Sequence, residues 1–139
     1  MKPQHIWVVL FVIIIQALSA CAGSSNTAPT TTPEAASPEK IVQDFYQAMS
    51  NGDLETALTF VAEDIECRGH CYITGRDSFQ TFIQGNIAHH DQFELSALRA
   101  AGDKVTFNYV IRRDSLVLAR GVDSVMQIQA GRIIYFEIN

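Results

Sequence analysis

The chain has 139 residues, with 10 Lys and Arg against 15 Asp and Glu, which gives a formal charge of −5 at pH 7. A chain of this length forms one domain of ordinary size, and its acidic balance argues against nucleic acid as a partner. The same balance argues against electrostatic docking on anionic lipid.

The first twenty residues have the layout of a secretory signal. An unbroken apolar run at 6–15 follows Lys2 and the amino terminus, and it is too short for a bilayer span, which needs about 20 apolar residues. The sequence LSAC at 18–21 resembles the bacterial lipobox, in which the cysteine is acylated and becomes the first residue after cleavage. The resemblance implies a signal peptide at 1–20, an acylated Cys21 and a membrane as partner.

Residues 22–37 are rich in Ala, Ser, Thr and Pro and contain no apolar side chain larger than Ala apart from proline. Such a segment buries too little surface to offset the entropy of ordering it. We therefore predict that residues 21–38 form the lipidated cysteine and a flexible tether, with a span of about 20–25 Å. The chain is expected to be extracytoplasmic and lipid-anchored. Because Ala22 is not Asp, the resemblance implies the outer membrane if the cell is Gram-negative.

Two helices are predicted directly after the tether. Residues 37–39 read Ser-Pro-Glu, which supplies a capping hydroxyl, a proline at the first helical position and an acid in the first turn. Asn51 and Gly52 end this helix, and Asp53 caps the next at once. The apolar stripes are Ile41, Phe45, Ala48 and Met49 in the first helix, and Leu54, Ala57, Leu58 and Val61 in the second.

The segment 65–73 is predicted to hold a strand and a turn between Cys67 and Cys71. Residues four apart on a straight strand lie about 13 Å apart, whereas a disulfide needs less than about 7 Å, so a bond requires a turn at Gly69. An oxidising compartment favours the bond, whereas the strand geometry opposes it. The sequence therefore does not decide whether Cys67 and Cys71 are bonded. No metal is predicted, because zinc signatures need a second ligand cluster. The alternative metal ligands are Cys67, Cys71, His70 and His89 or His90.

A third helix is expected after Gly75, with Asp77 as its cap. Beyond His90 the periodicity becomes alternating, which predicts a run of antiparallel strands. Three helices followed by such a run are typical of an α+β arrangement, with the helices on one face of the sheet. The helix face comprises Phe79, Phe82, Ile83, Asn86, Ile87 and His90, and the strands are expected around 93–97, 105–111, 116–129 and 132–138.

Three stretches carry a resemblance to a known superfamily: SNGDLE at 50–55, GRDSF at 75–79, and the last hairpin from DSVM at 123–126 to GRI at 131–133. In this order and spacing they resemble the nuclear transport factor two-like superfamily, and more narrowly its SnoaL-like bacterial members. The resemblance implies a cone at 39–139, with three N-terminal helices packed on a bent antiparallel sheet. Many members hold a ligand in the mouth of the cone, and many form dimers through the sheet.

The ketosteroid isomerases of this superfamily use a carboxylate base and an oxyanion hole made of a Tyr and a protonated Asp. Asp123 matches the position of the protonated Asp. Phe45 stands at the Tyr position and donates no hydrogen bond, and residues 67–69, near the base position, include no carboxylate. Two of three catalytic parts are therefore missing, so steroid isomerisation is not expected.

Asp123 is the remaining candidate for a catalytic group, because an acid among apolar residues is paired, protonated or at a mouth. Its alternative is an exposed or ion-paired acid. Residues 89–91, His-His-Asp, allow a general base with its orienting acid, or histidines that stabilise a helix C-terminus. Residues 112–114, Arg-Arg-Asp, are expected to be a solvated turn. The ligand-pocket candidates are Phe45, Tyr46, Tyr72, Phe82, Asp123, Val125 and Tyr135.

The sequence thus favours a lipid-anchored module that binds a small apolar ligand or a protein partner without catalysis and without a cofactor. One alternative is a SnoaL-like acid–base enzyme, an isomerase, cyclase or dehydratase, that uses Asp123. Another is a structural, dimerising element of an envelope complex, which predicts a closed mouth and an apolar patch on the outer face of the sheet.

Overall fold

The computed structural model describes residues 36–139. The expected signal peptide, Cys21 and the tether up to residue 35 lie outside these residues. Among residues 36–139, none of the helices combines the length and the hydropathy that crossing a bilayer requires. The elements are α1 (Pro38–Ser50), α2 (Leu54–Thr59), β1 (Val61–Gly69), β2 (Ile73–Thr74), α3 (Arg76–Ala88), β3 (Gln92–Ala101), β4 (Lys104–Arg113), β5 (Leu116–Gln129) and β6 (Arg132–Ile138).

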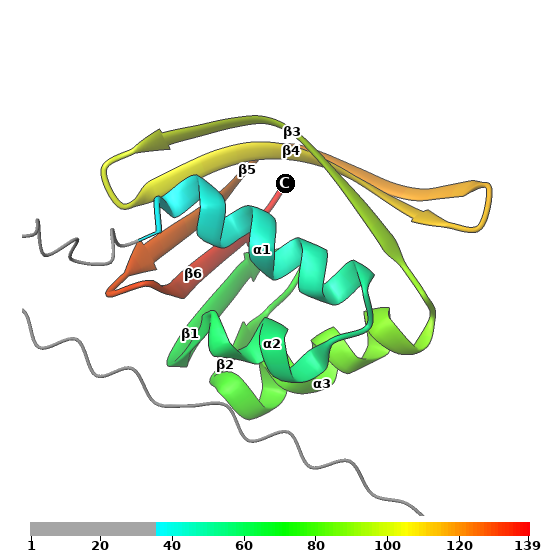
Figure 1. The fold of residues 1–139 in the computed structure, drawn as a ribbon, viewed down its shortest axis with the longest axis horizontal. Coiled ribbons are helices and arrows are strands. Elements are labelled where there is room, and N and C mark those ends of the chain that lie inside the picture. The colour runs from blue at the N-terminus through cyan, green and yellow to red at the C-terminus, as the bar shows by residue number, and fades with distance from the viewer. Residues whose placement is uncertain (1–35) are drawn as a thin grey trace, which may run out of the picture. The chain divides into compact units, whose positions relative to one another are not determined.

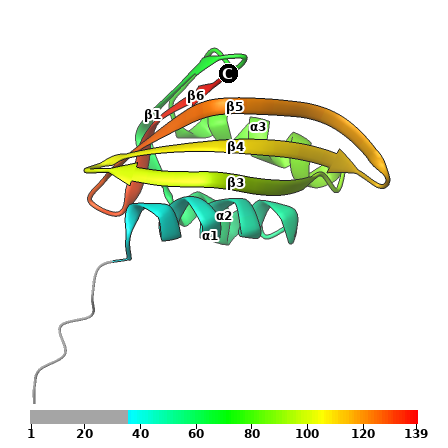
Figure 2. The same ribbon diagram turned by 90° about the horizontal axis from the view of Figure 1, so that it is seen from above.

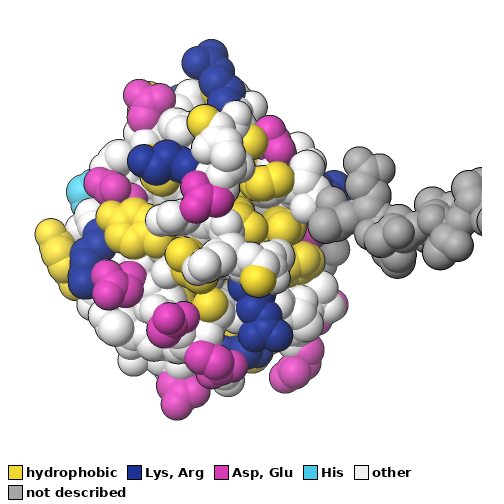
Figure 3. Space-filling model, turned by 90° about the vertical axis from the view of Figure 1, so that its left-hand side faces the viewer, with side chains coloured by type: hydrophobic (Ala, Val, Ile, Leu, Met, Phe, Trp, Pro, Cys, Tyr) yellow, Lys and Arg dark blue, Asp and Glu magenta, His cyan; other side chains and the backbone are white. Residues whose placement is uncertain are grey.

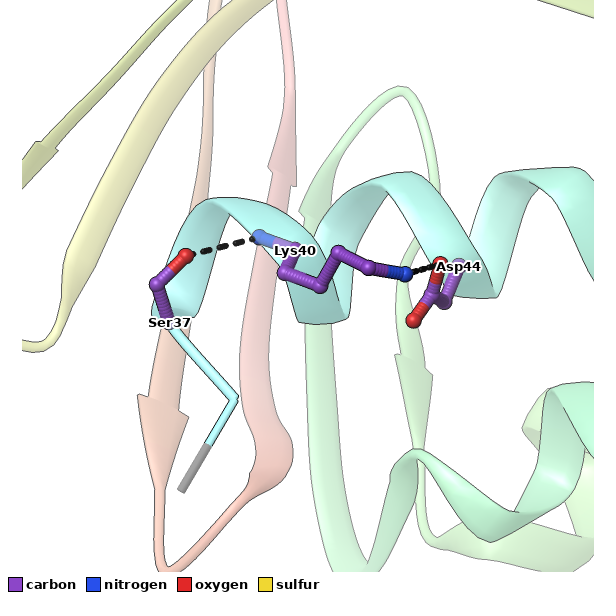
Figure 4. Close-up of polar contacts among 3 residues, drawn as sticks. All are labelled: Ser37, Lys40 and Asp44. Carbon is purple, nitrogen blue, oxygen red and sulfur yellow. Dashed lines mark hydrogen bonds and ion pairs between the residues drawn. The ribbon is translucent and has the colours of Figure 1, made fainter. Parts of the chain in front are cut away.

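The start of α1 is the one that its sequence predicts. The hydroxyl of Ser37 accepts a hydrogen bond from the backbone N–H of Lys40 at 3.3 Å, and Pro38 occupies the first turn. Figure 4 shows this cap together with the ion pair between Lys40 and Asp44 one turn further along the helix. These contacts satisfy an N–H group that the helix itself leaves without a partner.

The second and third helices differ from the prediction at one end each. Asp53 caps α2 as expected, accepting from Thr56 N–H at 3.0 Å, but α2 ends at Thr59 and Val61 begins β1. Val61 is paired with Ile133 there, and this contact between strands overrides the helical spacing. The cap of α3 is Gly75 without a side-chain hydrogen bond, and Asp77 lies in the first turn, where its charge still suits the helix dipole.

The six strands form one sheet in the order β2-β1-β6-β5-β4-β3. All neighbouring pairs are antiparallel except β1 and β6, which are parallel, so the expectation of an antiparallel sheet is wrong for this pair. A parallel pair needs a long connection, and α3 with the four strands β2, β3, β4 and β5 provides it. In Figure 1 the last strand, β6, lies between β1 and β5.

The helices cover the concave face of the bent sheet. α1 packs on β3 and β4, and α3 packs on β1 and β2; Figure 2 shows α1 alongside β3 with α3 behind the long strands. At its ends α1 is also bonded to β3: Glu39 accepts from the N–H of Ala100 at 3.0 Å, and Ser50 accepts from that of Phe93 at 3.1 Å. The largest fully buried side chains are Phe45, Phe79, Phe107, Ile65, Ile83 and Met126.

Candidate ligand-binding site

A small cavity lies between α1, α3 and the concave face of the sheet. Its volume is about 30 Å³, which is room for one or two water molecules. The walls are almost entirely apolar, so the interior of the cone is largely filled by the protein's own side chains. The lining residues are Phe45, Tyr46, Met49, Phe82, Phe93, Tyr109, Ile111, Phe136 and Ile138.

Tyr46 stands at the centre of the aromatic walls. Its ring centroid lies 5.1 Å from that of Phe93, 5.3 Å from Phe45 and 5.7 Å from Phe107. These separations are in the range of favourable aromatic pairs. Because α1 presents Phe45 and Tyr46 side by side and the strands present the other rings, the cavity is closed by contacts between rings.

Among the residues that the structure describes, Tyr46 and Tyr109 are the only ones on these walls that carry a titratable group. Burial raises the pKa of Tyr46 well above its usual value, and the nearby Tyr109 raises it further. Burial also raises the pKa of Tyr109. Both phenols therefore stay protonated at neutral pH, where they can donate and accept hydrogen bonds but do not act as bases.

Gly121 fixes the place of the Tyr109 ring. The two residues are directly opposite each other on β5 and β4, and a Cβ atom on Gly121 would overlap the ring and lie 2.6 Å from the backbone oxygen of Asn139. Only glycine leaves room for this approach. The cavity wall thus depends on a missing side chain on the neighbouring strand.

Three of the predicted pocket residues, Phe45, Tyr46 and Phe82, line the cavity. Tyr72 does not, since it is 84% exposed in the segment that follows β1. Val125 and Tyr135 also lie outside the lining. They are on the paired strands β5 and β6, with their side chains on the outer side of the sheet. The hydroxyl of Tyr135 donates to Glu137 at 3.1 Å there. The buried neighbours Ser124 and Met126 take the inward positions of β5, and side chains alternate along a strand.

Asp123 is exposed and lies outside the cavity lining, which corrects its expected place in a pocket. The reason is a β-bulge, in which Asn108 on β4 faces both Val122 and Asp123 on β5. Asp123 has a φ of 55°, and its N–H donates to the side-chain oxygen of Asn108 at 3.0 Å. A bulge re-aims the side chain that it contains, so the carboxylate points away from the interior.

The expected solvated turn at 112–114 is also corrected, because Arg113 binds a buried acid. Its Nε and one terminal nitrogen donate to the two carboxylate oxygens of Asp91 at 2.8 and 3.2 Å. Asp91 is only 5% exposed, whereas His89 and His90 are exposed. The acid therefore clamps the start of β3 to the end of β4 and does not orient a histidine.

Cys67 and Cys71 are joined by a disulfide, with their Cα atoms 5.5 Å apart. The turn that this needs is made at Gly69, whose φ is 80° and which packs against the backbone of Ile138. The bonded sulfur atoms are not available as metal ligands. Within residues 36–139, no cluster of three or more His, Cys, Asp or Glu side chains is arranged to hold a metal ion.

Sequence reasoning missed six lining residues, although a signal for them was present. The alternation Val105, Phe107, Tyr109, Ile111 places Tyr109 on the same face as the buried Phe107. The same rule applied to the last strand finds Phe136 and Ile138, two residues apart. The six residues are Met49, Phe93, Tyr109, Ile111, Phe136 and Ile138.

The family model for the SnoaL-like domain matches residues 42–136. The chain belongs to this family. A crystal structure of an NTF2-like protein of unknown function from Cytophaga hutchinsonii is similar, with 13% identity, 74% of this chain and 88% of that chain covered, and a TM-score of 0.63. A Mycobacterium tuberculosis protein in complex with estradiol-17beta-hemisuccinate is similar too, with 17% identity, 74% and 93% coverage, and a TM-score of 0.63. These likenesses confirm the expected nuclear transport factor two-like cone.

One curated relative of this SnoaL-like chain is a much longer protein. It is the serine/threonine-protein kinase PknA of Nostoc sp., 28% identical over 86 residues, which are 62% of this chain and 15% of the kinase. The chain thus spans about one seventh of that relative, and the likeness concerns a single segment of it.

Proposed function

We propose that this chain is a membrane-anchored extracytoplasmic lipoprotein whose SnoaL-like domain binds a small apolar ligand without catalysis. One observation carries the non-catalytic part: no carboxylate, imidazole or amine belongs to the cavity lining within the described residues. General acid–base catalysis needs a group with a pKa near the working pH. The two phenols of the lining are shifted away from that range.

The walls also restrict the ligand. A charged ligand would lose its hydration among Phe45, Phe82 and Phe136 without gaining a counter-charge. Since the cavity holds about 30 Å³, even a benzene-sized ligand must displace a ring, and Phe82 is only half-buried. We therefore expect a small, uncharged ligand that enters beside Phe82.

Toluene is a suitable probe for this site. The mature chain (residues 21–139, with Cys21→Ser) and its Phe82→Ala variant are titrated with toluene and followed by methyl NMR. We expect shifts at Met49 and Ile138, none at the hairpin residue Val117, and at least tenfold tighter binding by the variant, because a ring has been removed from the wall. Absence of any shift in both proteins at toluene saturation would reject the interior as a ligand site.

The alternative of an acid–base enzyme makes an opposite prediction. If the mature chain turns over a substrate of the isomerase, cyclase or dehydratase type, and Asp123→Asn abolishes the turnover at unchanged thermal stability, the non-catalytic proposal fails. We expect no such loss, because the carboxylate of Asp123 lies outside the cavity lining.

A protein partner or a second copy of this chain is the second candidate, and one observation favours it. Leu116, Leu118 and Val122 on β5 are 66%, 46% and 61% exposed, and exposed apolar side chains that gather on one element mark interaction surfaces. Sedimentation of the wild type against Val122→Asp tests this candidate. A dimer that the aspartate converts to a monomer supports it.

The anchor is tested separately. Cells fed an alkyne-tagged palmitate are expected to label the wild-type chain and not Cys21→Ser. An unlabelled wild-type chain that keeps Met1 would reject the lipoprotein part of the proposal and leave the binding part standing.

A further inference from the structure

An open apolar hollow lies at the end of the domain where α1 begins, separate from the interior cavity. Its volume is about 610 Å³. Figure 3 looks onto this end and shows hydrophobic side chains gathered in its middle, with both basic and acidic side chains around them. The residues that form most of it are Pro38, Ile41, Phe60, Gly102, Ile128 and Ala130.

Three basic side chains on the strands that end at this hollow form no ion pair with the described residues, and strand alternation places them on the outer side of the sheet at its rim. Within residues 36–139, four basic side chains form no salt bridge, whereas every other Lys and Arg is paired with an acid. The four are Arg99, Lys104, Arg120 and Arg132. Three of the four, Arg99, Lys104 and Arg132, lie within three residues of the turns at 102–103 and 130–131 that line the hollow. The net charge of the chain is negative, and acidic as well as basic side chains surround this end.

The nearby acids are engaged in hydrogen bonds. Asp103, which lines the hollow, accepts from the side chain of Gln127 at 2.9 Å. Glu39 accepts from the N–H of Ala100 at 3.0 Å, and Asp44 is paired with Lys40. We call the hollow together with Arg99, Lys104 and Arg132 the tether-end face.

The covalent chain also leads to this face. Ala36 lines the hollow, and 14 residues separate it from Cys21. With the flexible tether that the sequence predicts, this length would span about 20 Å, so the proposed anchor at Cys21 would keep this end close to the leaflet. A weak contact then suffices, because tethering by a short linker gives an effective concentration in the millimolar range.

We propose that the tether-end face docks on the phospholipid leaflet that holds the anchor. The apolar hollow receives acyl-chain or glycerol atoms of the leaflet, and Arg99, Lys104 and Arg132 contact headgroup phosphates, as basic residues beside an apolar face do in interfacial proteins. Docking fixes the orientation, with the end of β1 and Tyr72 directed away from the lipid. The inference rests on the proposed anchor for its source of lipid and for the effective concentration at which a weak contact suffices.

The one tryptophan of the sequence, Trp7, lies in the expected leader. The mature chain would therefore contain no tryptophan, and an introduced indole gives a fluorescence signal without background. With Cys21→Ser, so that no lipid is attached, Phe60→Trp places a single indole in the hollow and Tyr72→Trp places one beyond the far end of β1. The two ends of β1 lie opposite Ile133 and Ile138 of β6, so the two sites are about 17 Å apart along the sheet. On vesicles of phosphatidylcholine and phosphatidylglycerol at 7:3, with lipid in the millimolar range that the tether would supply, we expect a blue shift and quenching by brominated lipid for Phe60→Trp only. Ala36→Trp replaces it if Phe60→Trp fails to fold.

The charge part is tested with matched triple variants. Each cation near an anionic leaflet contributes about fivefold to binding, so changing Arg99, Lys104 and Arg132 together to Gln is expected to weaken vesicle binding by about 100-fold. The control changes Arg68, Arg112 and Arg120 to Gln, which alters net charge equally and leaves the face intact.

Equal loss in both triples, a shift of Tyr72→Trp, or no shift at either hollow position would overturn the docking proposal. None of these outcomes concerns acylation, because the tested chain carries no lipid. Failure of palmitate labelling with a positive Phe60→Trp result would instead reject the anchor and leave the lipid contact standing.

Discussion

The interior of the cone and the tether-end face are both apolar, yet one is closed and the other is open. In the interior, the rings around Tyr46 leave about 30 Å³. At the tether end, the turns at 102–103 and 130–131 carry Gly, Asp and Ala, whose small side chains leave about 610 Å³ uncovered. Apolar surface that the protein fills itself stabilises the fold, whereas apolar surface left open is available to something else. Four measurements sharpen or break this comparison.

The largest effect on stability is expected from removing one aromatic ring in the interior and, for comparison, one ring at the open hollow. Phe45 is fully buried, so Phe45→Ala should lower the free energy of unfolding by about 3–5 kcal/mol. Phe60 borders the open hollow and is half-buried, so Phe60→Ala should cost about half as much. Urea unfolding of both variants measures the difference. Equal losses would mean that the hollow is as closely packed as the interior.

Reduction of the disulfide comes next. Cys67 and Cys71 belong to the buried core and close a loop of only a few residues. Loop-closure entropy for so short a loop predicts a loss of about 2 kcal/mol on reduction or on the double change to Ala. Chemical denaturation with and without reductant tests this value. A change confined to the tether end, seen by hydrogen exchange, would contradict it.

The buried phenols make the interior sensitive to alkali. Because the pKa of Tyr46 is raised in the folded state, the unfolded chain ionises first, and stability present below pH 10 is lost as pH rises above it. The slope is about 1.4 kcal/mol per pH unit for one such group. Unfolding between pH 8 and 11, with tyrosinate absorbance as a second readout, should show this slope reduced in Tyr46→Phe. Tyr72→Phe, at an exposed position, is the control.

The smallest effect is expected at the tether end. Ser37 supplies a single hydrogen bond to the first turn of α1, so Ser37→Ala should cost about 1 kcal/mol. Ser37→Gly should cost only a few tenths. Thermal unfolding of the two variants gives the comparison, and a larger loss for the glycine would show that the cap is not the cause.

The sequence predicts features whose causes are local and misses those that depend on distant contacts. Ser37 and Asp53 cap their helices as expected because a cap involves residues three positions apart. The sequence leaves the facing of Asp123 open, because its bulge is held by Asn108 on another strand and by Asn139. The parallel partner of β1 is the last strand of the chain, and no local pattern reports such a pairing.

The candidate site divides in the same way. Phe45, Tyr46 and Phe82 follow from helical periodicity, whereas Tyr109 is recognised only once its strand is aligned with Phe107 and Gly121. The sequence does not predict the tether-end face, because its hollow is lined by the turns at 102–103 and 130–131, which are far apart in the chain.

The position of β6 has a consequence for biogenesis. The seven-residue strand β6 fits between β1 and β5, so two strands that precede it in the chain wait for a partner that is synthesised after them. While residues 132–138 are still inside the ribosome tunnel, the sheet has an unfilled slot and two open edges, which favour aggregation. Completion of the sheet is thus postponed until residues 132–138 have emerged.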